Sequence, residues 1–200
     1  QEEIWQNAEV DALGRLADAG VRVPETFGCI DGVLLMELIV DEDGNAAPRL
    51  DDVSMPLEQA LEDHAVMMDY VVRMLCAGLI HGDLSEFNVL VDEYGPVIID
   101  LPQAVNAAAN NQAEAMLARD IENMSRYYGR FAPELLTTRY AKEIWTLYEE
   151  GDLHPESPLT GYFEGDADDA DVDAVLEEIK AAMEEEEARL ERIRAAGDAE

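Results

Sequence analysis

The stretch "IHGDLSEFNVLVDEYGPVIIDLPQAV", residues 80–105, constrains this chain more than any other part of its sequence. It places Asp83 and Asn88 five positions apart in a polar loop, and Asp100 follows after two apolar runs. A plain β-hairpin with polar loops would explain the composition, but not this spacing. The spacing matches the phosphoryl-transfer pattern H-x-D-x-x-x-x-N, in which the Asp takes the proton of a substrate hydroxyl and the Asn holds a metal ion.

The same stretch supplies the ligands that a magnesium ion requires. Mg²⁺ prefers hard oxygen ligands and usually takes one or two carboxylates together with substrate phosphates. Asn88 and Asp100 would hold the ion, and Asp83 would stand beside them as the base. His81 is predicted to be structural, because a hydrogen bond from it could hold the backbone near Asp100 and a second base would duplicate Asp83.

Hydrophobic periodicity predicts the elements around this stretch. Apolar residues at helical spacing predict helices at residues 4–20, 57–77, 112–129, 133–150 and 172–196. Short β-rich runs predict strands within 21–40 and a hairpin of strands 88–91 and 97–99. A helix, a strand pair, and then mainly helices around a short hairpin indicate an α+β fold.

The charge balance excludes two classes of partner. The chain has 46 acidic and 13 basic residues, a net charge of −33, and only two lysines, Lys142 and Lys180. Such a chain repels nucleic acids and anionic membranes, so we expect it to bind neither directly. The carboxylates favour a halophilic protein over a mesophilic one with an acidic tail, because Asp and Glu are dense before residue 65 as well. Molar salt would screen the self-repulsion to within ~3 Å. With no apolar run of about eighteen residues and no signal-like segment, we expect a cytoplasmic location.

The two cysteines carry no recognisable chemistry. Cys29 and Cys76 lie far apart in apolar contexts and match no metal-binding spacing. They are therefore predicted to be buried thiols rather than a disulfide.

Several segments together resemble the RIO family of atypical protein kinases. The most specific are "HGDLSEFNVLV", "VIIDLPQAV" and "RDIENMSRYYGRF", and the resemblance covers about residues 5–163. The segments "NNQAEAMLARD" and "FAPELLTTRYAKEIWTLYEEGDL" are most similar to the bacterial-type members. The resemblance implies a protein-kinase-like fold of the RIO type, mostly the helical C-terminal lobe. Residues 1–40 would be a remnant of the N-terminal lobe, 41–163 the catalytic lobe, and 164–200 an acidic linker with an amphipathic helix.

The resemblance also implies roles for individual residues, with ATP and Mg²⁺ as cofactors. Asp83 would be the catalytic base, and Asn88 and Asp100 would be metal ligands. Asp100 is similar to the position at which some members form an aspartyl-phosphate during ATP turnover.

The resemblance further implies an adenine site. Met36 would be the gatekeeper residue, and the backbone of Glu37 and Ile39 would meet adenine. Glu9 is similar to the helix glutamate that pairs with the phosphate-binding lysine.

One departure from the family pattern is large. In the family, that lysine precedes the position of Glu9, and a glycine-rich loop precedes the lysine. Here both lysines follow the catalytic loop, and no G-x-G-x-x-G occurs before His81. Either the 200 residues are a piece that lacks most of the N-terminal lobe, or the protein has lost ATP chemistry. We expect the first, and in both cases weak nucleotide binding.

Three functions are weighed. The first is a RIO-type serine/threonine kinase or ATPase, which by resemblance would act with ribosome-maturation factors. The second is a small-molecule kinase like the aminoglycoside phosphotransferases, which share H-G-D-x-x-x-x-N but usually read "HPGN" where this chain has residues 85–88. The third is a non-catalytic scaffold that uses the acidic C-terminal helix; the intact Asp83, Asn88 and Asp100 argue against it.

Overall fold

The computed structural model describes residues 2–30, 33–101 and 105–163, with side chains from residue 10 onward except that of residue 109. The expected helix at 172–196 and the acidic linker before it lie outside the described residues.

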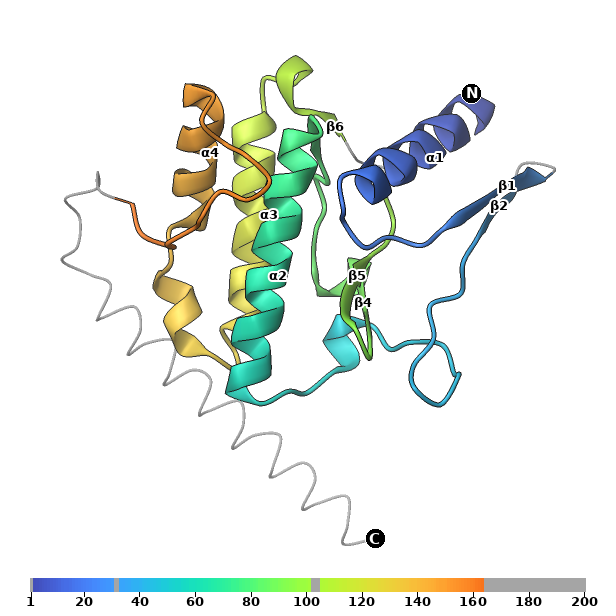
Figure 1. Ribbon diagram of the computed structural model, residues 1–200, viewed down its shortest axis with the longest axis horizontal. Helices are drawn as coiled ribbons and strands as arrows, with labels where there is room; N and C mark the ends of the chain where they lie inside the picture. The colour runs from blue at the N-terminus through green and yellow to red at the C-terminus, as the bar shows by residue number, and fades with distance from the viewer. Residues whose placement is uncertain (1, 31–32, 102–104, 164–200) are drawn as a thin grey trace, which may run out of the picture. The chain divides into compact units, whose positions relative to one another are not determined.

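Helices dominate the described chain, and three small sheets accompany them (Figure 1). The α-helices are α1 (Glu2–Asp18), α2 (Leu57–Cys76), α3 (Ala113–Tyr128) and α4 (Tyr140–Glu150). Short 3₁₀ turns are η1 (Leu50–Asp52), η2 (Glu86–Asn88), η3 (Ala107–Ala109) and η4 (Pro133–Thr137). Antiparallel pairs are β1 (Thr26–Ile30) with β2 (Val33–Met36), β3 (Leu79–Ile80) with β6 (Val105–Asn106), and β4 (Val89–Asp92) with β5 (Gly95–Ile98). This arrangement confirms the predicted α+β class.

The core forms where α2 packs on α3 and α3 packs on α4, as Figure 1 shows. Apolar side chains recur every three or four residues along α2 and α3, so each helix presents one apolar side to its neighbour. The fully buried members include Met67, Met68, Leu75, Met124 and Tyr128. α2 ends where Gly78 adopts a φ of +76°, a left-handed conformation that glycine tolerates. The predicted helices at 57–77 and 112–129 are confirmed to within about one residue.

The expected helix at 133–150 is wrong in its first part, because the chain forms η4 there and α4 begins later. Between them, the Thr138 hydroxyl donates to the Leu135 carbonyl at 2.7 Å. The Arg139 N–H donates to the Gly161 carbonyl, also at 2.7 Å, and not to a helical carbonyl. Local threonine bonds compete with helical ones, and the contact with Gly161 comes from a segment remote in sequence.

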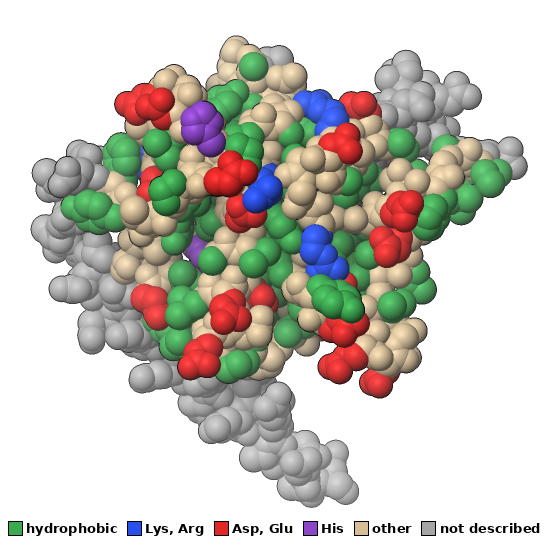
Figure 2. Space-filling view, in the orientation of Figure 1, with side chains coloured by type: hydrophobic (Ala, Val, Ile, Leu, Met, Phe, Trp, Pro, Cys, Tyr) green, Lys and Arg blue, Asp and Glu red, His purple; other side chains and the backbone are tan. Residues whose placement is uncertain are grey.

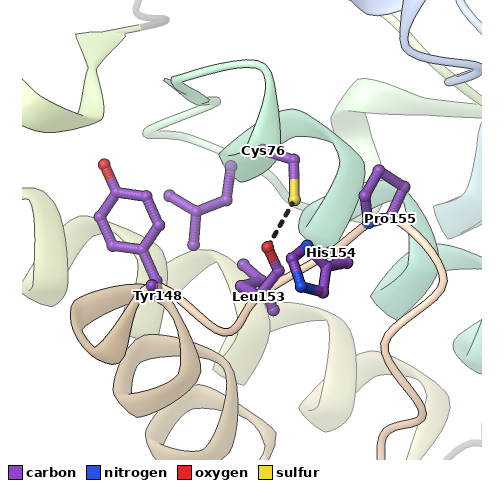
Figure 3. A pocket seen from close by; sticks show the side chains of 7 residues that line it. Cys76, Tyr148, Leu153, His154 and Pro155 are labelled. Carbon is purple, nitrogen blue, oxygen red and sulfur yellow. Dashed lines mark hydrogen bonds between the residues drawn. The ribbon is translucent and has the colours of Figure 1, made fainter.

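The predicted burial of the two cysteines is also wrong, since both are exposed. Cys29 lies on β1, and the pairing of β1 with β2 leaves most of this two-stranded sheet exposed. Cys76 is the last residue of α2, and its Sγ lies 3.8 Å from the Leu153 carbonyl oxygen. It lines an open pocket of about 430 Å³ together with Tyr148 and His154 (Figure 3). A sheet of only two strands leaves Cys29 exposed, and the position at the end of a helix leaves Cys76 exposed. A local sequence pattern indicates neither.

Acidic side chains are spread over the visible surface in separate groups (Figure 2). Figure 2 shows Asp and Glu side chains scattered over the visible face, with few Lys or Arg side chains among them. In the part of the chain that the structure describes, none of the helices has the length and apolar character needed to cross a bilayer.

Candidate active site

The buried ring of His81, which is 1% exposed, holds the loop between β3 and β4 in place. Its Nε2 lies 3.3 Å from the Ile99 carbonyl oxygen, and its Nδ1 lies 3.3 Å from the Asp83 amide nitrogen. A carbonyl can only accept and an amide can only donate, so the ring is neutral with its proton on Nε2. Burial lowers the pKa of His81, against the opposing effects of the Ile99 carbonyl, Asp83 and Asp100. The predicted structural role of His81, holding the backbone next to Asp100, is confirmed.

Asp120 on α3 is a site residue that the sequence analysis missed. Its carboxylate is 1% exposed and accepts hydrogen bonds from the Gly82 N–H at 2.7 Å and the Leu84 N–H at 3.0 Å. These two amides flank Asp83, so the bonds hold the loop on both sides of that residue. Gly82 has a φ of +83°, which favours glycine at this position. A carboxylate within the apolar side of a predicted helix was the signal that could have identified Asp120.

Burial has a clear electrostatic effect on Asp120. It raises the pKa of the carboxyl to about 6, although the bonds from Gly82 and Leu84 act in the opposite direction. The two amide N–H groups favour the charged form of the carboxyl, which accepts both bonds.

Two further side chains of α3 bind the same loop. Arg119 donates to the Gly82 carbonyl, and Asn123 Nδ2 donates to the Leu84 carbonyl at 3.0 Å. The peptide groups around Asp83 are thus bound to one helix, while Asp83 itself is exposed. A fixed backbone with an exposed carboxylate suits a residue that must meet a substrate.

Asn88 and Asp100 meet at one end of the β4–β5 hairpin. The Ile99 N–H donates to the Asn88 carbonyl at 2.9 Å, which brings the residue before Asp100 next to Asn88. Asn88 Nδ2 donates to the Asp83 carbonyl at 2.8 Å. The His81 ring contacts the backbone next to both aspartates, since it binds the Ile99 carbonyl and the Asp83 amide. The structure thus brings together the three residues that the spacing singled out.

Asp100 has an unusual backbone conformation. Its φ is +63°, and among the described residues it is the only one other than glycine with a positive φ. Such a conformation is uncommon for a residue with a side chain, and residues of this kind cluster at functional sites.

The residues present fit a magnesium ion. Because the amide nitrogen of Asn88 donates to the Asp83 carbonyl, its amide oxygen is the group that could bind a metal. Asp100 would add a carboxylate oxygen. Within the described residues, no three His, Cys, Asp or Glu side chains converge as a metal cage. An amide oxygen and a carboxylate suit an ion that takes its remaining ligands from water and substrate phosphates.

The predicted adenine site follows β2. The Glu37 N–H donates to the Glu25 carbonyl at 2.8 Å, and the Ile39 carbonyl accepts from the Ala47 N–H at 2.9 Å. Within the described part of the chain, these bonds leave the Glu37 carbonyl and the Ile39 N–H as one acceptor and one donor two residues apart. Ile39 is 7% exposed and packs against Val97 of β5, so this segment contacts the hairpin that carries Asn88. Met36, 41% exposed, directly precedes it.

The remaining expected site residue is Glu9. It lies in α1, but its side chain is outside the part of the chain that the structure describes. No lysine precedes Lys142, and Lys142 on α4 pairs with Glu114 at 3.3 Å. The described chain therefore brings no lysine to the site.

Most of this chain is similar in sequence to known proteins. A family model described as the RIO domain matches residues 1–141. "RIO-type serine/threonine-protein kinase Rio1" of Haloferax volcanii is 39% identical over 126 residues, which is 63% of this chain and 42% of that protein. The Thermoplasma acidophilum protein of the same name is 33% identical over 131 residues, 66% of this chain and 67% of that protein. "Serine/threonine-protein kinase RIO1" of Homo sapiens is 33% identical over 145 residues, 72% of this chain and 25% of that protein.

Proposed function

Because the chain belongs to the RIO family, in which the relatives described above are named serine/threonine-protein kinases, we propose that its site transfers the γ-phosphate of ATP. The acceptor would be a serine or threonine hydroxyl of a protein, or water. The observation that carries this proposal is the meeting of Asp83, Asn88 and Asp100 on a loop and hairpin held by His81 and Asp120.

Each residue has a defined task in this proposal. Asp83, exposed on a backbone bound to α3, takes the proton of the attacking hydroxyl as the new P–O bond forms and the bond to ADP breaks. Asn88 and Asp100 would hold Mg²⁺, which supplies the positive charge that offsets the phosphates. The Glu37 carbonyl and the Ile39 N–H would bind adenine beside Met36. Glu9 would pair with a phosphate-binding lysine.

Phosphoryl transfer of this kind is mainly a matter of positioning and charge. The described residues would supply the base, the metal ligands and the adenine-binding groups. Residues 1–40 would then be the part of the N-terminal lobe present here, and 41–163 the catalytic lobe.

Family membership favours a protein kinase or ATPase over an aminoglycoside-type kinase. The chain spans about two fifths of the Haloferax volcanii relative, so its protein substrate is inferred by family resemblance alone. We propose ribosome-maturation factors as the partners on that basis. A scaffold role would depend on the acidic C-terminal helix, which lies outside the described residues.

Nucleotide titration of the ¹⁵N-labelled chain tests the site directly. We expect millimolar Mg·ATP to shift the NMR amide signals of Asn88 and Ile99 at the metal site and those of Glu37 and Ile39 at the adenine site. Mg·tripolyphosphate, which lacks adenine, should shift only the first pair. Asp100→Ala should remove the magnesium dependence of the first pair. If the shifts of Asn88 and Ile99 still depended on magnesium in Asp100→Ala, the proposed metal site would be contradicted.

The excess of carboxylates leads us to propose a protein adapted to a cytoplasm of high salt. At a net charge of −33, self-repulsion is strong at low salt and is screened at molar salt. A few kcal/mol of relieved repulsion corresponds to about 10 °C in melting temperature for a chain of this size. We expect a rise of that order between low and molar KCl, measured by circular dichroism. An unchanged melting temperature across this range would rule out the adaptation.

A further inference from the structure

Arginines hold the end of α1 and the loop after it to the rest of the molecule. Arg15 donates to the Ala77 carbonyl beyond the end of α2, and Arg73 of α2 donates to the Ala19 carbonyl at 3.3 Å. Arg22 makes the third connection, to the β4–β5 hairpin. In a chain with only 13 basic residues, three of them lie at this one junction.

Arg22 binds the turn of the hairpin through several groups. Its Nη1 and Nη2 donate to the two carboxylate oxygens of Asp92 at 2.9 and 2.6 Å, and Nη1 also donates to the Gly95 carbonyl at 3.1 Å. The guanidinium carbon lies 5.8 Å from the ring centroid of Tyr94. The Arg22 carbonyl in turn accepts from the Ile98 N–H at 2.9 Å. Main chain and side chain of this one residue thus bind both ends of β5.

The pair is more than a surface contact. The Asp92 side chain is 9% exposed and also accepts from the Tyr94 N–H at 2.8 Å. The bond with Arg22 lowers the pKa of Asp92, and the same bond raises the pKa of Arg22. Two parallel bonds from a planar guanidinium fix orientation as well as distance, which an ammonium group cannot do.

The hairpin connects this ion pair to the metal site. Asp92 pairs with Gly95 at the turn, and Val89 pairs with Ile98 at the opposite end. Asn88 precedes that end, and Ile99 and Asp100 follow it. At about 3.3 Å per residue, the two ends are only ~10 Å apart, so a tilt at the turn displaces the ligand residues.

We propose that Arg22 is a positioning residue for the metal site: by binding Asp92 and Gly95, it sets the orientation of the hairpin that presents Asn88 and Asp100. The inference rests on the proposed metal site. Through Arg22, the loop after α1 would be connected to the proposed magnesium ligands. α1 is the helix that contains Glu9.

The test measures metal binding and does not require catalysis. Mn²⁺ is added to the ¹⁵N-labelled 200-residue chain, and paramagnetic broadening of the Asn88 and Ile99 amide signals gives the affinity of this site alone. This readout separates the site from diffuse binding to the many surface carboxylates. Asp100→Ala identifies the broadening that belongs to the site.

Arg22→Met, which keeps the aliphatic stem and removes the guanidinium, should weaken this Mn²⁺ affinity about tenfold, the usual effect of disturbing a residue behind a metal ligand. Arg15→Met is the matched control, because it removes a guanidinium from the same junction without a contact to the hairpin. It should change the affinity by less than about twofold. Thermal melting of both variants separates lost stability from lost positioning.

Arg22→Lys covers the case in which Arg22→Met does not fold. It keeps the charge but not the two parallel bonds, so it should still weaken Mn²⁺ binding measurably in a folded chain. Wild-type Mn²⁺ affinity in both Arg22→Lys and Arg22→Met, or equal weakening in Arg15→Met, would overturn the role of Arg22. The proposed metal site would still stand. Absence of any broadening at Asn88 and Ile99 in the wild-type chain would overturn the metal site as well.

Discussion

The 200-residue chain is expected to hydrolyse no ATP above background and to bind it with millimolar affinity or worse. In our proposal its residues would supply a base, two metal ligands and the adenine-binding backbone, but the sequence has no lysine before Lys142 and no glycine-rich loop before His81. In phosphoryl transfer, metal ions and a lysine together offset the charge of the β- and γ-phosphates. Without the lysine, the triphosphate would lie beside Asp83 and Asp100 with only the metal to balance their charge. Phosphate release and calorimetric titration with Mg·ATP measure both quantities.

A chimera provides the positive control for this expectation. Joining the glycine-rich loop and lysine segment of a RIO relative ahead of residue 1 should produce turnover, and replacing that lysine with alanine should remove it. Magnesium-dependent hydrolysis by the 200-residue chain alone, lost in Asp100→Ala but not in Asp83→Ala, would show that the missing lysine matters less than we propose.

Substitutions in the active chimera should separate the roles of the two carboxylates. Asp100→Ala should abolish metal-dependent nucleotide binding and turnover together, because the metal loses its carboxylate ligand. Asp83→Ala should leave binding intact and reduce turnover by ~10²–10⁴-fold, the usual contribution of a general base.

The same calorimetric and phosphate-release assays apply to both variants. Asp83→Asn serves as the matched control, since it keeps the shape of the side chain and removes its basicity. An equal loss of nucleotide binding in Asp83→Ala and Asp100→Ala would contradict the assigned roles.

The motif and the main helices could be predicted from the sequence because both depend on local spacing. The five-residue separation of Asp83 and Asn88 is a property of one loop, and a turn and a short hairpin bring Asp100 back to it. The apolar repeats of 57–77 and 112–129 likewise follow from the geometry of a single helix. The net charge also follows from the composition alone and does not depend on the fold.

Other features depended on contacts between remote segments. Asp120 reaches Gly82 across 38 residues, and Arg22 reaches Asp92 across 70. No spacing rule connects such positions, because their distance is set by how whole helices and hairpins pack. The break before α4 has the same origin, since Arg139 bonds to Gly161 and not within the helix. The sequence alone therefore determined which residues could carry the chemistry. Only the tertiary structure decided which side chains hold those residues in place, because local periodicity does not specify the neighbours of a buried carboxylate or ion pair.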